Sequence, residues 1–276
     1  MATPEVSSPN PVEVGALYDG FDTMDVLHFG YWDDDEDQTP VPEAADRLTD
    51  MVSERVGATA GKRLIDVGCG IGTPALRVAR LTGAEVVGIT VSRKQVERAT
   101  KSAESEGLTG QVEFRYADAM QMPFEDESFD SAYALESIIH MDRRRALREI
   151  SRVVRPGGRI VLTDVYDRIP APEGRPSLMH FLVQAWMMSP LIRRDDYPAL
   201  AAEVGLRLVE VSDISEQVLW RTLRRIAQQM RSEQPALVPE QIVDQIDASH
   251  ETVPDLPEML ENAQELGCLL VVLERA

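Results

Sequence analysis

The 276-residue chain is poor in cysteine and has few basic residues for its acidic content. Cys69 and Cys268 are its only cysteines, which is too few for a disulfide framework. The 28 Lys and Arg residues stand against 47 Asp and Glu residues, which gives a formal net charge of −19. Binding to nucleic acid or to an anionic membrane surface requires a basic surface, so we expect neither kind of partner.

The chain also lacks a long hydrophobic run. The longest apolar run in its C-terminal part, residues 268–273, is far shorter than the about 20 residues that cross a bilayer, and we expect a buried strand there. No N-terminal segment combines basic residues with an apolar stretch, so no secretory signal is expected. Since 43% of the residues are hydrophobic, the chain can bury a large core. We therefore expect a globular cytoplasmic protein.

Short apolar runs alternate with amphipathic segments through the middle of the chain. The apolar runs predict strands at residues 63–67, 84–89, 112–116, 129–134 and 159–164. The segments between them predict helices at residues 74–81, 93–105 and 144–153. Such alternation implies right-handed crossovers and a parallel sheet with helices on both faces, which is an α/β fold.

The segment before the alternating strands and helices contains a polar lead-in, an acidic run and one expected helix. Residues 1–12 are rich in Pro and Ser and predict a mobile lead-in, whereas residues 43–56 carry one apolar stripe and predict a helix. The acidic run at residues 33–37 suggests a metal site, but no histidine accompanies it and the EF-hand spacing is missing. We therefore expect a solvated loop and no metal ion.

The last third of the chain has a different pattern. Two apolar runs, residues 206–211 and 269–273, are separated by mostly helical sequence that includes an amphipathic segment at residues 219–230. A helical insert between the last two strands would form a cap over the sheet, at about residues 212–265.

A glycine-rich turn follows the first expected strand and has the sequence Asp66-Val-Gly68-Cys69-Gly70-Ile-Gly72. An open α/β sheet forms its ligand crevice at this place. Glycines let a ligand approach the main chain, and the amides at the following helix N-terminus favour a negative group. The dinucleotide pattern G-x-G-x-x-G is not met, because Thr73 follows the third glycine, so binding of NAD is disfavoured.

This turn, with Asp118-Ala119 after the third strand and the lead-in to the fifth strand at residues 147–158, resembles the class I S-adenosylmethionine-dependent methyltransferases over about residues 18–165. The resemblance implies a Rossmann-like, seven-stranded, mostly parallel sheet with an N-terminal helical lid and a helical cap before the last strand. In this division the lid spans residues 13–60, the cofactor-binding core spans 61–165, and residues 166–276 complete the sheet and carry the cap.

The resemblance also implies a cofactor, S-adenosylmethionine, and the residues that hold it. The glycine turn would cradle the methionine part and Asp118 would accept a hydrogen bond from the adenine amine. Most members end the second strand with an acidic residue, but here Thr90 stands in that position and, with Gln95, would hold the ribose. The predicted cofactor residues are Asp66, Gly68, Cys69, Gly70, Thr90, Gln95, Asp118, Ala119 and Glu136.

The threonine is similar to a subset that includes sterol C-methyltransferases, cyclopropane fatty acid synthases and actinomycete natural-product methyltransferases such as the rebeccamycin sugar O-methyltransferase. Residues 27–32 and 134–141 are similar to that last group. His140 follows the fourth strand, and a neutral imidazole there can take a proton from a hydroxyl. In the rebeccamycin-like enzymes such a histidine is paired with an aspartate at the end of the fifth strand, which implies that Asp164 orients His140.

Bulky side chains before and after the core are candidates for binding an apolar acceptor. Their alternative role is packing of the N-terminal helix and of the cap. The candidates are Tyr18, His28, Tyr31 and Trp32 in the lid, and Trp186, Tyr197 and Trp220 toward the cap.

These residues favour O-methylation of a hydroxyl on a small, largely apolar secondary metabolite such as a polyketide or glycoside. Two alternatives stay open: C-methylation of an alkene or activated carbon within an aromatic cage, and a cyclase that uses the methyltransferase fold with a bound cofactor but transfers no methyl group. The family suggests a homodimer as a possible assembly.

Overall fold

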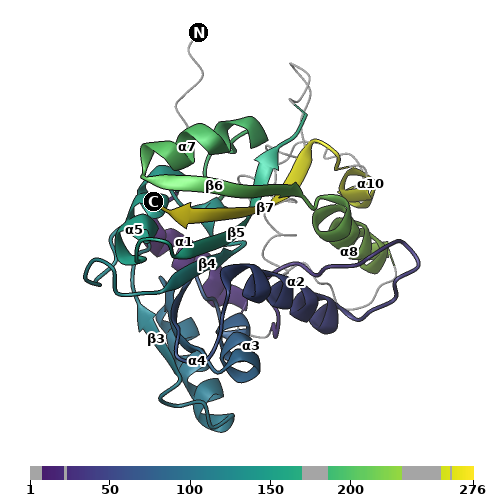
Figure 1. Ribbon diagram of the computed structural model, residues 1–276. Helices are drawn as coiled ribbons and strands as arrows, with labels where there is room; N and C mark the ends of the chain where they lie inside the picture. The colour runs from purple at the N-terminus through teal and green to yellow at the C-terminus, as the bar shows by residue number, and fades with distance from the viewer. Residues whose placement is uncertain (1–7, 22–23, 170–185, 232–255, 262) are drawn as a thin grey trace.

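The computed structural model describes residues 8–21, 24–169, 186–231, 256–261 and 263–276. Its central element is one seven-stranded sheet with the strand order β3-β2-β1-β4-β5-β7-β6 (Figure 1). The strands are β1 Arg63–Val67, β2 Glu85–Thr90, β3 Val112–Tyr116, β4 Ser131–Leu135, β5 Arg159–Asp167, β6 Leu206–Asp213 and β7 Leu266–Arg275. Strands β1 to β5 pair in parallel, whereas β7 is antiparallel to both β5 and β6. The predicted Rossmann-like sheet, seven-stranded and mostly parallel, is confirmed.

The crossover helices begin and end at recognisable residues. They are α3 Thr73–Thr82, α4 Arg93–Ser105 and α5 Arg143–Val153. Helix α3 has Pro74 in its first turn and ends at Gly83, which has a φ of 72°, and the Ser92 side chain caps α4 by accepting from the Gln95 amide. Strands at 63–67 and 112–116 and the helix at 93–105 have the predicted bounds, and the fourth strand starts two residues late because Phe129 makes only an isolated bridge.

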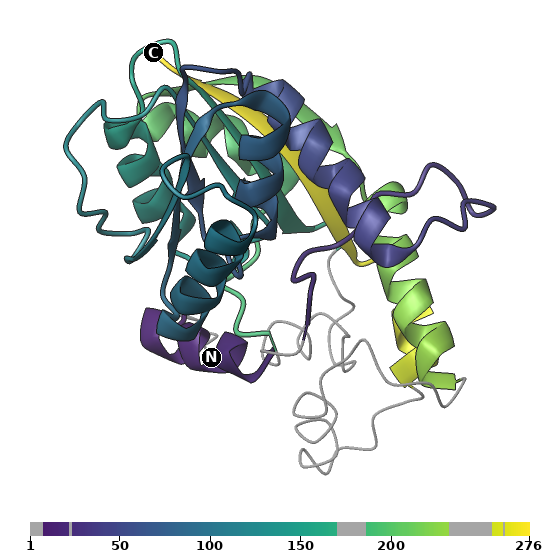
Figure 2. The same cartoon turned by 90° about the horizontal axis from the view of Figure 1, so that it is seen from below.

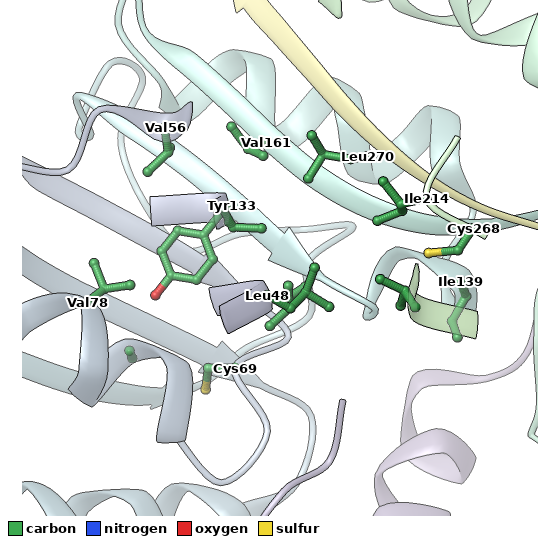
Figure 3. Close-up of a cluster of buried hydrophobic side chains, with 14 of the residues drawn as sticks. Leu48, Val56, Cys69, Val78, Tyr133, Ile139, Val161, Ile214, Cys268 and Leu270 are labelled. Atoms are coloured by element: carbon green, nitrogen blue, oxygen red, sulfur yellow. The ribbon is translucent and has the colours of Figure 1, made fainter. Parts of the chain in front are cut away.

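Both faces of the sheet are covered by apolar side chains. Helix α2, Val41–Val56, lies on one face, where Leu48 and Val56 join Tyr133 and Val161 in one buried cluster (Figure 3). Helix α5 contributes to the cluster on the other face. Because the central strands are buried on both sides, they are continuous apolar runs rather than alternating ones.

The N-terminal segment starts its helix earlier than expected. Helix α1 spans Pro11–Tyr18 because Asn10 caps it by accepting from the Val12 amide and a proline opens the first turn. A short 3₁₀ turn, Asp19–Phe21, follows. Residues 1–7 of the predicted lead-in lie outside the described residues. Helix α1 lies beside the start of α4 (Figure 2), where the Ser92 hydroxyl donates to the Asp19 carboxylate.

A helical insert does separate the last two strands. After α7, Tyr197–Glu203, and β6, a π-helical turn at Glu216–Trp220 leads into α8, Arg221–Arg231. Helix α10, Leu256–Glu261, packs against α8 before β7 begins (Figure 1). The rest of the expected cap, residues 232–255, lies outside the described residues.

The acidic run at 33–37 is a largely exposed loop, as expected, and it also makes contacts with α8. Asp35 forms ion pairs with Arg221 and Arg224, and the Asp37 carbonyl accepts from Arg225. The loop is therefore attached to the basic face of α8. Among the described residues, no helix has the length and apolarity that crossing a bilayer requires.

Candidate active site

A cavity lies at the carboxyl ends of β1, β2, β3 and β4, and α1 closes one side of it. Its volume is about 960 Å³ when the open mouth is included. All nine predicted cofactor residues line it, from Asp66 in the glycine turn to Glu136 after β4. His140, Tyr18 and His28 line it as well.

The glycine turn is closely packed on its far side. Gly68 has a φ of 80°, and a Cβ atom added there would lie 2.3 Å from the Cβ atom of Ser137. The amides of Gly68 and Cys69 both donate to the Ile89 carbonyl, at 2.9 Å each. Cys69 is buried with its sulfur against Gly88, so it acts as a small packing residue, and burial raises the pKa of its thiol.

Two buried carboxylates in the cavity have an oxygen without a partner. Asp66 Oδ2 and Glu136 Oε1 make no hydrogen bond within the described part of the chain. Burial raises the pKa of Asp66 to about 7 and that of Glu136 to about 8. The other oxygen of Glu136 accepts from the Phe29 amide at 2.8 Å, which fixes the side chain. Unsatisfied buried acceptors of this kind suit a ligand that carries ammonium and hydroxyl donors.

The next strand ends supply further polar groups. Thr90 Oγ1 donates to Gln95 Oε1 at 2.6 Å, and both side chains are buried, so the two residues predicted to hold a ribose lie together. Asp118 follows β3, and its Oδ1 atom accepts from the Met120 amide at 2.8 Å. The loop amide thereby orients the carboxylate at the cavity wall.

His140 lies in a short 3₁₀ turn, Ile138–His140, after β4. Its Nδ1 atom is 3.1 Å from the Met187 carbonyl, which can only accept, so Nδ1 carries the proton. Its Nε2 atom is therefore the acceptor for the Tyr18 hydroxyl at 2.8 Å. Burial, with a smaller contribution from the Arg143 charge, lowers the pKa of His140 to about 4. The imidazole is thus neutral at pH 7, and its Nε2 lone pair is directed at the Tyr18 hydroxyl in the cavity wall.

Asp164 does not pair with His140, which corrects the predicted contact. Its Oδ2 atom accepts from Arg143 Nε at 2.6 Å and from the Tyr197 hydroxyl at 2.5 Å. Its Oδ1 atom accepts from Arg143 Nη2 at 2.7 Å. The aspartate is fully buried, and these donors occupy both oxygens. The sequence analysis did not identify Arg143 as part of the site. One feature could have indicated it, since Arg143 lies in the first turn of α5, where a positive charge is unfavourable.

The predicted acceptor residues divide into two groups. Tyr18 and His28 line the cavity, and the ring of Trp186 reaches the Tyr18 ring through Phe21, which has centroid distances of 5.8 Å and 5.4 Å to them. Burial lowers the pKa of His28 to about 4, so that imidazole is neutral at pH 7 as well.

The other four acceptor candidates pack elsewhere, in their alternative role. Trp32 is fully buried, donates to the Thr39 carbonyl and lies under Arg225. Trp220 donates to the Leu266 carbonyl at 2.8 Å. Tyr31 packs against the core and Tyr197 holds Asp164, so none of the four lines the described cavity.

Comparison with known proteins gives consistent matches. A family model described as a methyltransferase domain matches residues 65–162. The chain is 42% identical to the methyltransferase GfsG of Streptomyces halstedii, over 74% of this chain and 76% of that protein. It is 40% identical to the 27-O-demethylrifamycin SV methyltransferase of Amycolatopsis mediterranei, over 76% of this chain and 79% of that protein. The crystal structure of the cyclase SpnF matches with a TM-score of 0.79 and 28% identity, covering 98% of both chains.

Proposed function

Because the chain belongs to the class I S-adenosylmethionine-dependent methyltransferases, we propose that it methylates a hydroxyl group of a small, largely apolar secondary metabolite, with His140 as the general base. The observation that carries the proposal is the neutral imidazole in the cavity wall whose Nε2 atom accepts from the Tyr18 hydroxyl. S-adenosylmethionine is the cofactor and supplies a methyl group on a sulfonium.

The described residues fit this cofactor. The unsatisfied oxygens of Asp66 and Glu136 can accept from its ammonium and hydroxyl groups. The Thr90 and Gln95 pair lies at the end of the next strand and can hold the ribose, and the Asp118 carboxylate can accept from the adenine amine. The glycine turn passes close to Ser137 and Leu27, where an added Cβ atom would lie within 2.3 Å and 3.2 Å of them, so glycine is needed there.

At the acceptor end, His140 is the residue that takes the proton from the acceptor hydroxyl. The Met187 carbonyl fixes Nδ1 as the protonated nitrogen, so Nε2 can accept the proton of an acceptor hydroxyl that replaces the hydroxyl of Tyr18. General-base assistance of this kind is typically worth about 10²- to 10⁴-fold in rate.

The acceptor class rests on the wall of the cavity and on the relatives. Val14, Leu27, Leu135 and Met141 are apolar residues of the cavity wall, to which His140 and Tyr18 also belong. The relative from Amycolatopsis mediterranei is named for methylation of an oxygen of 27-O-demethylrifamycin SV. An apolar natural product with a free hydroxyl matches both observations.

The test is transfer of label from methyl-labelled S-adenosylmethionine, with 27-O-demethylrifamycin SV and an organic extract of bacterial metabolites as acceptor probes. We expect a labelled apolar product that is lost in Asp66→Ala and falls about 10²- to 10⁴-fold in His140→Ala. Wild-type turnover in His140→Ala on the same acceptor would rule out the histidine as base.

A second candidate is a cyclase that binds the cofactor without transferring its methyl group. The likeness to SpnF across 98% of both chains favours it. A cyclase would convert its substrate equally well with S-adenosylhomocysteine in place of S-adenosylmethionine, and the product would contain no label. Turnover that requires S-adenosylmethionine excludes this candidate.

A further inference from the structure

A buried ion pair lies behind His140, outside the cavity. The side chains of Arg143 and Asp164 are 4% and 0% exposed, and the guanidinium binds both carboxylate oxygens. The Tyr197 hydroxyl donates to the same carboxylate. This arrangement joins the start of α5, the end of β5 and the start of α7 at one point.

The same guanidinium also holds the segment that carries the partner of His140. Arg143 Nη1 donates to the Pro190 carbonyl at 3.0 Å. Three residues earlier, Met187 has a φ of 46°, in the left-handed region that non-glycine residues rarely adopt, and its carbonyl accepts from His140. Between them the Ser189 amide donates to the turn that contains His140, at 2.7 Å. The segment is thus attached to the histidine at one end and to Arg143 at the other.

We propose that Arg143, held in place by Asp164 and Tyr197, is a positioning residue that sets the tautomer of His140 through the Pro190 and Met187 carbonyls. The inference rests on the proposed function, since a fixed Nδ1 proton matters because Nε2 is the base. Asp164 therefore acts on the histidine indirectly. It holds Arg143, which holds the segment whose Met187 carbonyl contacts His140.

The charges around His140 support this role. Arg143 from α5 disfavours the protonated imidazole, Asp164 from β5 favours it, and the Tyr18 hydroxyl from α1 donates to the neutral ring. A guanidinium that bridges Asp164 and Pro190 therefore places the Met187 carbonyl, and its charge adds to burial in favouring the neutral ring. A purely structural ion pair would affect stability alone, and apolar residues of similar volume can often replace such a pair without loss of stability. The tautomer and the charge of His140 would then not depend on it.

The experiment compares the double variant Arg143→Met/Asp164→Leu with wild type by melting temperature, steady-state kinetics and nitrogen NMR of His140, identified by its loss in His140→Gln. We expect the double variant to melt close to wild type. We expect kcat to fall about 10- to 100-fold with the KM for S-adenosylmethionine unchanged, because a shifted base is misaligned. The NMR signals of the ring should change from one tautomer to a mixture. A double variant that kept both the wild-type kcat and the single tautomer would overturn the proposal.

The matched control is Arg77→Met/Asp50→Leu. Arg77 also binds an aspartate through Nε and Nη2, at 2.6 Å and 2.7 Å, but links α3 to α2 away from His140. It should leave kcat and the tautomer unchanged. If the first double variant does not fold, Arg143→Lys and Tyr197→Phe give the same readout, and a single tautomer in both would equally overturn the proposal. The NMR measurement needs no acceptor, so it decides this inference even if His140→Ala retains turnover and the proposed function fails.

Discussion

The two ends of the cavity are built differently. The cofactor end is made of residues that follow consecutive strands, and its shape comes from glycines and main-chain amides within short stretches of sequence. The acceptor end joins α1, the turn after β4 and the segment 186–190, and its contacts link residues as far apart as Tyr18 and His140. The first end is fixed by local backbone geometry, and the second by side-chain hydrogen bonds between distant elements.

The largest expected effect is at the cofactor end. Gly68→Ala places a Cβ atom 2.3 Å from Ser137 at a φ of 80°, and strain of that kind costs about 1–3 kcal/mol, so we expect about 100-fold weaker binding of S-adenosylhomocysteine. Gly61 has the same φ with nothing within 4 Å. Gly61→Ala should therefore lower stability by about 1 kcal/mol and leave affinity unchanged, as calorimetry can measure. Equal losses of affinity would contradict the assignment of the turn.

The next effect is a pH dependence at the same end. The pKa values of about 7 for Asp66 and about 8 for Glu136 mean that both carboxyls lose protons as pH rises from 6 to 8. A cationic cofactor binds better to the ionised forms, so its binding should release protons and tighten about tenfold over this range. Asp66→Asn removes one titrating group and should flatten the profile. A wild-type dissociation constant that is independent of pH would refute this explanation.

A smaller effect is expected at the acceptor end. The Tyr18 hydroxyl donates to His140 Nε2 and stabilises the neutral ring, and Tyr18→Phe removes it. The pKa of His140 should rise, and the KM of the acceptor should fall about three- to tenfold, since the acceptor hydroxyl no longer has a competitor. NMR titration and kinetics measure the two quantities. Tyr116→Phe, at an exposed tyrosine, is the control, and a fall in kcat with an unchanged KM would point to a different role for Tyr18.

The smallest effect concerns the loop that carries Trp32. Arg225 lies 4.4 Å from the centre of the Trp32 ring, and its loss should lower stability by about 1 kcal/mol without changing cofactor affinity. Thermal melting of Arg225→Gln measures this. Arg207→Gln, which breaks an exposed ion pair with Glu274, should change the melting temperature less. Similar shifts in both variants would mean that neither the ring contact nor the bond from Arg225 to the Asp37 carbonyl contributes to stability.

The same contrast explains how much the sequence predicted. All nine predicted cofactor residues line the cavity, because each lies at the carboxyl end of a parallel strand or within a few residues after it. The roles assigned to them remain predictions. Sheet class, strand placement and the helical insert followed from periodicity in the same way.

The acceptor end could not be predicted to the same degree. Bulky rings such as Trp32, Trp220 and Tyr197 have polar atoms that bind partners far along the chain, and composition does not distinguish such packing from a ligand site. The aspartate after β5 was expected to contact the histidine directly. No spacing in the sequence indicates that Arg143 takes both of its oxygens.

The pairing of β6 with β7 has a consequence for how the periphery of this scaffold can vary. Asp213 and Leu269 are paired neighbours in the sheet, so the helical insert leaves and re-enters the fold at adjacent points. A segment anchored in this way can be exchanged as a cassette, because the entropic cost of closing it grows only with the logarithm of its length. The described residues of the insert do not line the cavity, so both ends of the cavity would stay in place during such an exchange.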